Sequence, residues 1–317
     1  MEYIILILSL AGIVLGADFL VKGAVVVARK CRVSSFVIGA VIVGIGTSLP
    51  ELVVSTVGAI GGNSEVAIGN VVGSNIFNVF AILGLTALFF PIAVSRENMK
   101  FEIPFCIAVS ILLMLLVYNF FIVGEPRLGR WDGAALLLVF TSFMWISLRR
   151  GKSSAATVGE SVEEVNKSLW FAAFSILGGL AALIVSSNFF VDEAVAIARK
   201  LGVSDAFISI TLLACGTSLP ELAASVTAAV KKDTDMALGN IIGSNIFNVT
   251  MILGTASLIT PLTTGKIGLV DYGAMILSAV LPMIFGIRGK ITRIEGLLML
   301  LCYAAYTWYI VTYVMAV

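Results

Sequence analysis

Apolar stretches of about twenty residues recur from one end of the chain to the other, separated by short polar segments. Each stretch is long enough to cross a hydrocarbon core about 30 Å thick as a helix. Strands of a membrane barrel would instead alternate apolar and polar positions over about ten residues, so helices are predicted. The ten predicted spans cover residues 3–28, 34–61, 66–91, 103–122, 131–148, 169–198, 204–230, 236–260, 268–287 and 294–316.

The second half of this pattern repeats the first. A shift of 170 positions aligns residues 33–52 with 203–222 and residues 69–79 with 239–249, where GNVVGSNIFNV becomes GNIIGSNIFNV. Each repeat contains five spans, and an odd number makes the second repeat enter the membrane from the opposite side. We therefore predict an all-α membrane protein of ten transmembrane helices, built from two inverted repeats at residues 1–148 and 169–317.

The distribution of basic residues predicts the orientation. The polar segment at residues 149–168, RRGKSSAATVGESVEEVNKS, is typical of a flexible linker between the repeats. Fourteen Lys and Arg residues lie in loops on its side of the membrane, and five lie on the other side. Because cytoplasmic loops carry the excess of positive charge, we expect this linker in the cytoplasm and both termini outside the cell membrane.

Composition narrows the chemistry. Only 12% of residues are charged and the net charge is +1, so no basic face for nucleic acid is expected. Histidine is absent, and the four cysteines are widely separated, which favours neither a zinc site nor a disulfide framework. Any bound cation must therefore use oxygen ligands.

The heptapeptide GTSLPEL interrupts the second span at residues 46–52 and recurs at residues 216–222. Pro50 has no N–H and its ring crowds the Gly46 carbonyl, so the helix is predicted to break. Glu51 lies about 25 Å along its span at 1.5 Å per residue, which places it near mid-membrane. An ionisable group at that depth is a functional candidate, although Ser48 and Glu51 also match a capping box, a purely structural motif.

A second duplicated motif places polar side chains on one helical face. Asn70, Ser74 and Asn78 are spaced by four residues, as are their counterparts 170 positions later. Asn70 and its counterpart Asn240 are nearest the ends of this face, where they could simply hold helices together. The candidate ligands on this face are Ser74, Asn78, Ser244 and Asn248.

The breaks and the polar faces together supply two carboxylates, several hydroxyls and amides, and freed backbone carbonyls. Hard cations such as Ca²⁺ take six to eight oxygens at 2.3–2.6 Å, and two carboxylates neutralise one divalent ion. Mg²⁺ fits less well, because it keeps its waters and seldom takes an all-protein cage.

These duplicated motifs resemble the α-repeats of the Ca²⁺/cation antiporter superfamily, and within it the prokaryotic Na⁺/Ca²⁺ exchangers. The resemblance implies that Glu51 and Glu221 bind Ca²⁺ together with the backbone carbonyls of Thr47 and Thr217. It also implies overlapping and flanking Na⁺ positions formed by Ser48, Ser74, Ser218, Ser244 and the carbonyls of Gly44 and Ala214. Some prokaryotic exchangers and the K⁺-dependent branch have Asp where this chain has Asn248, whereas K⁺-independent exchangers tend to have Asn, so the resemblance argues against K⁺ co-transport.

The leading hypothesis is a secondary antiporter in which Na⁺ and Ca²⁺ compete for the same carboxylates, normally extruding Ca²⁺ by alternating access. An H⁺/Ca²⁺ exchanger could use the same glutamates as protonatable groups, and a cation channel could also use paired acidic residues. No enzyme activity or cofactor is expected, because no general base besides the glutamates lies at depth. The expected partners are Ca²⁺, Na⁺ and the lipid bilayer, with the chain working as a monomer. Asp18 and Lys22, four residues apart in the first span, are spaced to form an ion pair.

Overall fold

The computed structural model describes residues 2–118, 126–153, 168–201 and 214–314, and these are almost entirely helical. The helices of the first repeat are α1 (Glu2–Cys31), α2 (Ser35–Ile38), α3 (Gly44–Thr47), α4 (Leu49–Ile60), α5 (Ser64–Phe77), α6 (Gly84–Phe89), α7 (Ile103–Tyr118) and α8 (Arg130–Ser153). Those of the second are α10 (Leu169–Lys200), α12 (Ala214–Gly216), α13 (Leu219–Val230), α14 (Thr234–Phe247), α15 (Leu253–Ile259), α16 (Leu269–Gly286) and α17 (Arg293–Tyr309). Wider π-helical turns continue several of these helices, namely η1 (Gly39–Val43), η2 (Asn78–Leu83), η3 (Asn98–Glu102), η6 (Asn248–Ile252) and η7 (Ile310–Val314).

The predicted spans agree with this helix order wherever the chain is described. Eight helices are long and apolar enough to cross a membrane, and the bent pair Ser35–Thr47 and Leu49–Ile60 makes up to nine among the described residues. The part of the predicted span 204–230 that precedes Ala214 lies outside the described residues, and α13 forms its second part. Helix α8 continues to Ser153, so the first residues of the predicted linker are helical, and residues 154–167 lie outside the description.

Two short strand pairs show how the repeats are related. β1 (Ile92–Ala93) pairs antiparallel with β4 (Lys290–Ile291), and β2 (Arg127–Leu128) pairs antiparallel with β3 (Leu262–Thr263). The shift of 170 positions makes β1 the counterpart of β3. Later in each repeat the shift is 163 positions, which aligns Arg130 with Arg293 and makes β2 the counterpart of β4. Each strand therefore pairs with the other repeat, and the two pairs are equivalent to each other. This reciprocal exchange agrees with the predicted inverted repeats.

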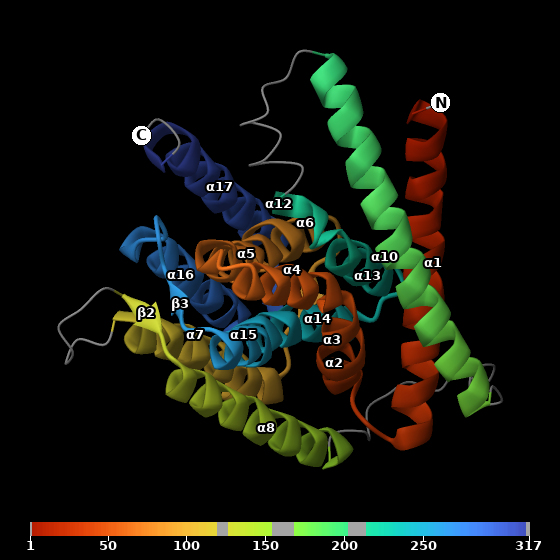
Figure 1. Ribbon diagram of the computed structural model, residues 1–317. Helices are drawn as coiled ribbons and strands as arrows, with labels where there is room; N and C mark the ends of the chain where they lie inside the picture. The colour runs from red at the N-terminus through yellow and green to blue at the C-terminus, as the bar shows by residue number, and fades with distance from the viewer. Residues whose placement is uncertain (1, 119–125, 154–167, 202–213, 315–317) are drawn as a thin grey trace.

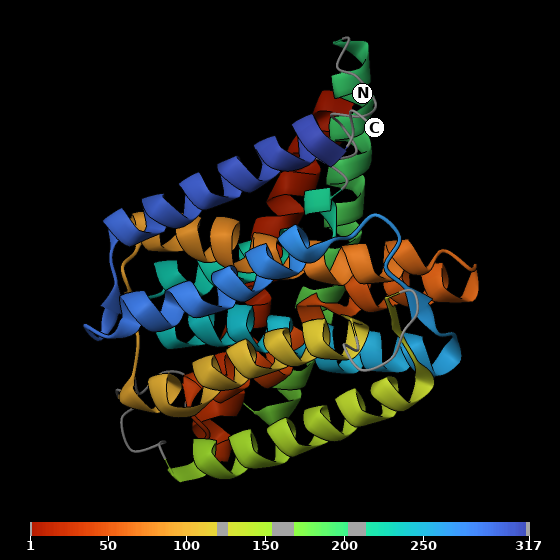
Figure 2. The ribbon, with the colours of Figure 1, turned by 90° about the vertical axis from the view of Figure 1, so that its left-hand side faces the viewer.

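Helices α1 and α10 form a long antiparallel pair at one side of the molecule (Figure 1). They have 30 and 32 residues, and they cross the other helices steeply (Figure 2). Glycines allow the close approach, since a Cβ added at Gly179 would lie 2.6 Å from the Leu20 backbone nitrogen and 2.7 Å from the Gly16 carbonyl oxygen. Small residues at such contacts let helix backbones pack directly.

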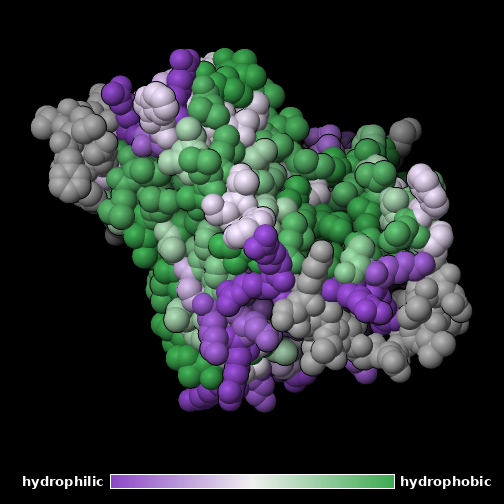
Figure 3. All heavy atoms as spheres, turned by 90° about the horizontal axis from the view of Figure 1, so that it is seen from below, coloured by the Kyte–Doolittle hydropathy of each residue, from purple (hydrophilic) through white to green (hydrophobic). Residues whose placement is uncertain are grey.

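The remaining helices surround α5 and α14, whose side chains are the most thoroughly buried. Many large apolar side chains on the outer helices are exposed instead, including Ile60, Leu138 and Phe174. From below, a broad hydrophobic surface separates hydrophilic residues that gather mainly toward the upper and lower margins (Figure 3). Such a surface is what a membrane-embedded protein presents to lipid.

Candidate ion-binding site

Both predicted helix breaks are present. Helix α3 ends at Thr47 and α4 begins at Leu49 with a bend of 47°, because Ser48 leaves the helical conformation at φ −84° and ψ 9°. In the second repeat, Ser218 adopts nearly the same angles, φ −92° and ψ 7°, just before α13. A proline in the first turn of each following helix explains the break, since it offers no N–H to the preceding turn.

The serines at the breaks bind across the two repeats. The Ser48 hydroxyl donates to Glu221 Oε1 at 2.7 Å, and the Ser218 hydroxyl donates to Glu51 Oε1 at 3.0 Å. Neither serine caps its own helix through its side chain, so the capping-box interpretation is wrong. All four side chains are fully buried. Each glutamate is therefore oriented by the opposite repeat.

Several buried oxygens around these glutamates have no hydrogen-bond donor. They are the second carboxylate oxygens of Glu51 and Glu221 and the amide oxygens of Asn78 and Asn248. Among the described residues, no lysine or arginine forms an ion pair with either glutamate. Leaving such groups unpaired in a protein interior is costly, and a bound cation is a partner that oxygens of this kind accept.

A reciprocal group of four asparagines orients the two amide oxygens. Asn75 and Asn245 each donate from Nδ2 to the other's backbone carbonyl at 3.1 Å. Asn78 donates to Asn245 Oδ1 at 3.0 Å, and Asn248 donates to Asn75 Oδ1 at 3.1 Å. With their nitrogens engaged in this way, Asn78 and Asn248 keep their oxygens free for a cation. Sequence reasoning missed Asn75 and Asn245, although both lie inside the repeated GSNIFN motif.

The outermost asparagines of the polar faces hold helices together, as the sequence suggested. Asn70 Nδ2 donates to the Glu51 backbone carbonyl at 3.2 Å and to the Ser55 hydroxyl at 3.0 Å. Asn240 makes the equivalent bond to the Glu221 carbonyl, also at 3.2 Å. These contacts fasten the helix that carries each glutamate to the neighbouring central helix.

Hydroxyls from both repeats meet at the Gly44 carbonyl. Thr47 Oγ1 from the same helix and Ser244 Oγ from α14 each donate to this carbonyl oxygen at 3.3 Å. Thr47 also donates to Asn240 Oδ1 at 3.3 Å. The structure thus brings three of the predicted site residues, Gly44, Thr47 and Ser244, together.

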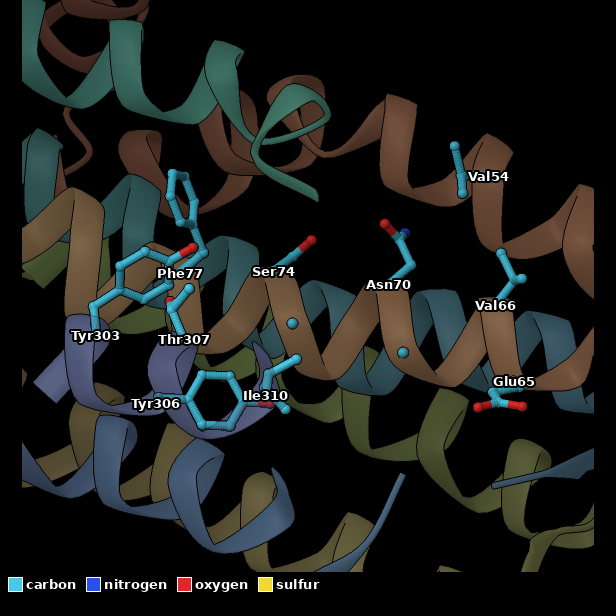
Figure 4. Close-up of a pocket in the computed structure, with 12 residues that line it drawn as sticks. Val54, Glu65, Val66, Asn70, Ser74, Phe77, Tyr303, Tyr306, Thr307 and Ile310 are labelled. Atoms are coloured by element: carbon cyan, nitrogen blue, oxygen red, sulfur yellow. The ribbon is translucent and has the colours of Figure 1, made fainter. Parts of the chain in front are cut away.

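The remaining predicted residues are Thr217, Ala214 and Ser74. Thr217 is half-buried beside the second break, and Ala214 begins α12, where only its backbone is described. Ser74 is buried and lines a cavity of about 550 Å³ beside α5, together with Asn70 and Glu65. In Figure 4, Ser74 and Asn70 project from the same side of α5 toward α4, while Glu65 points away from it. The cavity reaches the polar face of α5 without including either site glutamate.

Among the described residues, the charge at the site comes from the two glutamates. The described residues contain no cluster of three or more His, Cys, Asp or Glu side chains able to hold a metal ion. A cation here would be held by two carboxylates and several neutral oxygens, which suits a hard ion such as Ca²⁺ or Na⁺.

Asp18 belongs to a separate ion-pair group on α1. Its carboxylate lies 2.6 Å from Lys22 Nζ, as its spacing predicted, and 2.7 Å from Lys231 Nζ. The second contact, which the sequence did not indicate, ties α1 to the end of α13. The three side chains are 29–43% exposed, which agrees with a role outside the ion site.

Comparison with known proteins gives a consistent result. Residues 1–149 and 171–312 match the family described as sodium/calcium exchanger protein. A putative antiporter, CaxA of Alkalimonas amylolytica, is 37% identical over 95% of this chain and 97% of its own length. The sodium/calcium exchanger MaX1 of Methanosarcina acetivorans is 34% identical over 96% of this chain and 97% of its own length. A solved structure of the sodium-calcium exchanger NCX_Mj, soaked with 10 mM Na⁺ and zero Ca²⁺, matches with a TM-score of 0.83 at 32% identity, covering 98% of both chains.

Proposed function

The chain belongs to the sodium/calcium exchanger family, and we propose that it exchanges Na⁺ for Ca²⁺ by alternating access, normally extruding Ca²⁺. The single observation that supports this most strongly is the set of buried, unpartnered oxygens on Glu51, Glu221, Asn78 and Asn248. Two carboxylates balance the charge of one Ca²⁺, and the neutral oxygens extend its coordination toward the six to eight that it prefers.

Competition for the same carboxylates would couple the two ions. An ion can shift the equilibrium between two conformations only through its different affinity for each of them. Without an ion, two uncompensated carboxylates in a dry interior oppose closure of the site. Either Ca²⁺ or Na⁺ removes this penalty, so each crossing requires a bound ion and exchange follows.

The remaining predicted ligands complete the two kinds of site in this proposal. Ca²⁺ is bound by Glu51 and Glu221 with the Thr47 and Thr217 carbonyls. Na⁺ uses the carbonyls of Gly44 and Ala214 and the hydroxyls of four serines, namely Ser48, Ser74, Ser218 and Ser244. Thr47 and Ser244 already surround Gly44, which supports a cluster of oxygens at this point.

Alternating access is assigned to movement of the α1–α10 pair against the other helices. The two helices pack closely on each other through glycines, so the pair can shift as one unit. Glu2 and Lys200 form an ion pair at 2.5 Å, which puts the start of the first span and the end of the sixth on one side. This is the arrangement that ten spans with both termini outside and a cytoplasmic linker require. A monomer suffices because both repeats of one chain supply the ligands.

The decisive experiment measures ⁴⁵Ca²⁺ uptake into Na⁺-loaded proteoliposomes. We expect Na⁺-dependent uptake by the wild type and none by Glu51→Gln or Glu221→Gln, whereas Glu97→Gln, at an exposed carboxylate, should transport normally. Exchange that survives in either site variant would overturn the assignment. Uptake driven by a pH gradient without Na⁺ would instead identify a proton exchanger, and rates that do not saturate with Ca²⁺ would point to a channel.

A further inference from the structure

A second cavity, of about 450 Å³, lies away from the ion site at the end of α16. It is bounded by the connection from β1 to α7 and by the turn between α16 and α17. At the far left of Figure 2 the blue turn after α16 lies beside the orange connection leading to α7. The pairing of β1 with β4 and a bond from the Val94 N–H to the Gly289 carbonyl at 2.9 Å hold the two segments together.

Three cations line this cavity, and no carboxylate does among the described residues. They are Arg96, Lys100 and Arg288, all exposed. Within the part of the chain that is described, none of the three forms an ion pair. Three positive groups around one hollow repel each other, and an anion placed between them would remove that repulsion.

The cavity also has an apolar side. Helix α16 exposes Met283 (37%) and Ile284 (51%) near its end. Ile287 (74%), which follows the helix and precedes Arg288, is also exposed and lines the cavity itself. An exposed apolar helix face that ends in basic residues is the pattern expected at the boundary between hydrocarbon and headgroups.

The inverted repeat provides an internal comparison. At the corresponding positions of the other repeat, Arg96 is replaced by Lys266, Lys100 by Val270 and Arg288 by Glu125. If the fold itself required three cations at this place, both repeats would carry them. The basic character instead belongs to one face, the face with the larger number of Lys and Arg residues.

We propose that this cavity binds the phosphate group of an anionic phospholipid, with its acyl chains lying against the exposed face of α16. Basic pockets at the cytoplasmic boundary of membrane helices are suited to such headgroups. The apolar wall formed by Ile287 distinguishes this ligand from free phosphate, which would gain nothing from it. Bound lipid would join the turn after α16 to the start of α7.

The test is thermal unfolding of the purified full chain in dodecyl maltoside micelles containing phosphatidylglycerol, phosphatidylcholine or inorganic phosphate. Phosphatidylglycerol should raise the melting temperature by about 2–4 °C, because a ligand that binds only the folded state stabilises it. The combined variant Arg96→Gln, Lys100→Gln and Arg288→Gln should lose this rise while melting like the wild type in phosphatidylcholine. Lys266→Gln, the matched variant on the opposite face, should keep it.

Two single variants at Arg288 distinguish a loss of lipid binding from a folding defect in the combined variant. Arg288→Lys, which retains the charge, should keep most of the rise, and Arg288→Gln alone should reduce it. An unchanged rise in the combined variant would overturn the proposal, as would an equal rise with phosphatidylcholine. A full rise with inorganic phosphate alone would also overturn it, by showing a site for soluble anions. None of these measurements depends on transport.

Discussion

Replacing Asn75 by alanine tests whether the four-asparagine group holds the centre of the protein together. The change removes the bond from Asn75 Nδ2 to the Asn245 carbonyl and the acceptor for Asn248 Nδ2, both at 3.1 Å. The Asn245 carbonyl still accepts the Asn248 backbone N–H, so it loses one bond of two. The Asn248 amide nitrogen, in contrast, is left without an acceptor in a fully buried position.

The magnitude follows from these two losses. One lost hydrogen bond costs about 0.5–1.5 kcal/mol, and one buried group left unsatisfied costs about 1–3 kcal/mol. We therefore expect Asn75→Ala to lower the free energy of unfolding by about 1.5–4.5 kcal/mol. Because Asn245 makes the mirror-image bonds to Asn75 and Asn78, Asn245→Ala should lower it by a similar amount.

The assay is denaturant titration of the purified variants in mixed micelles, with Asn188→Ala as the control. Asn188 is exposed on α10, and substitutions at such positions usually change stability by less than about 0.5 kcal/mol. An Asn75→Ala protein as stable as this control would refute the reasoning. So would a large effect at Asn75 with none at Asn245, because the structure gives both residues the same bonds.

Three further predictions concern separate features. Ser48→Ala should weaken ⁴⁵Ca²⁺ binding roughly 2- to 12-fold, because ordering the released glutamate costs about 0.5–1.5 kcal/mol. The control Ser110→Ala loses only a bond within α7 and should bind Ca²⁺ normally. Gly179→Ala should lower the melting temperature, because overpacking at this contact costs about 1–3 kcal/mol. Gly178→Ala should not lower it, because the added carbon has open space around it. Equal melting temperatures for the two variants would contradict the close approach of α1 and α10. Asp18→Asn should change the free energy of unfolding by less than about 1 kcal/mol, since Asp18 and its partners are partly exposed. The difference from wild type should shrink as the concentration of choline chloride is raised. A larger loss that does not depend on salt would show a buried interaction instead.

Much of the architecture could be predicted from local sequence patterns. Long apolar runs identify membrane spans because each helix satisfies its own backbone in lipid. The duplication with five spans in each half predicted the inversion that the exchanged strand pairs display. Pro50 predicted a helix break because the effect of proline is confined to the neighbouring turn, and Glu51 was conspicuous as a charge at that break.

What the sequence could not reveal depends on how the two repeats face each other. Ser48 and Glu51 fit a local capping box equally well, and only the packed structure shows that Ser48 binds Glu221 instead. The bond between Asn75 and Asn245 and the contact of Lys231 with Asp18 are likewise invisible in the chain order.

The sequence by itself determined the membrane class, the duplicated repeats and the two breaks, and it singled out both glutamates as candidate ligands. These features follow from hydrophobicity, periodicity and the covalent nature of proline, all of which act over a few turns of one helix. The tertiary structure alone decided which hydroxyl orients which carboxylate, and which amide oxygens remain without a donor. Those choices join residues about 170 positions apart, so only the packing of one repeat against the other could make them.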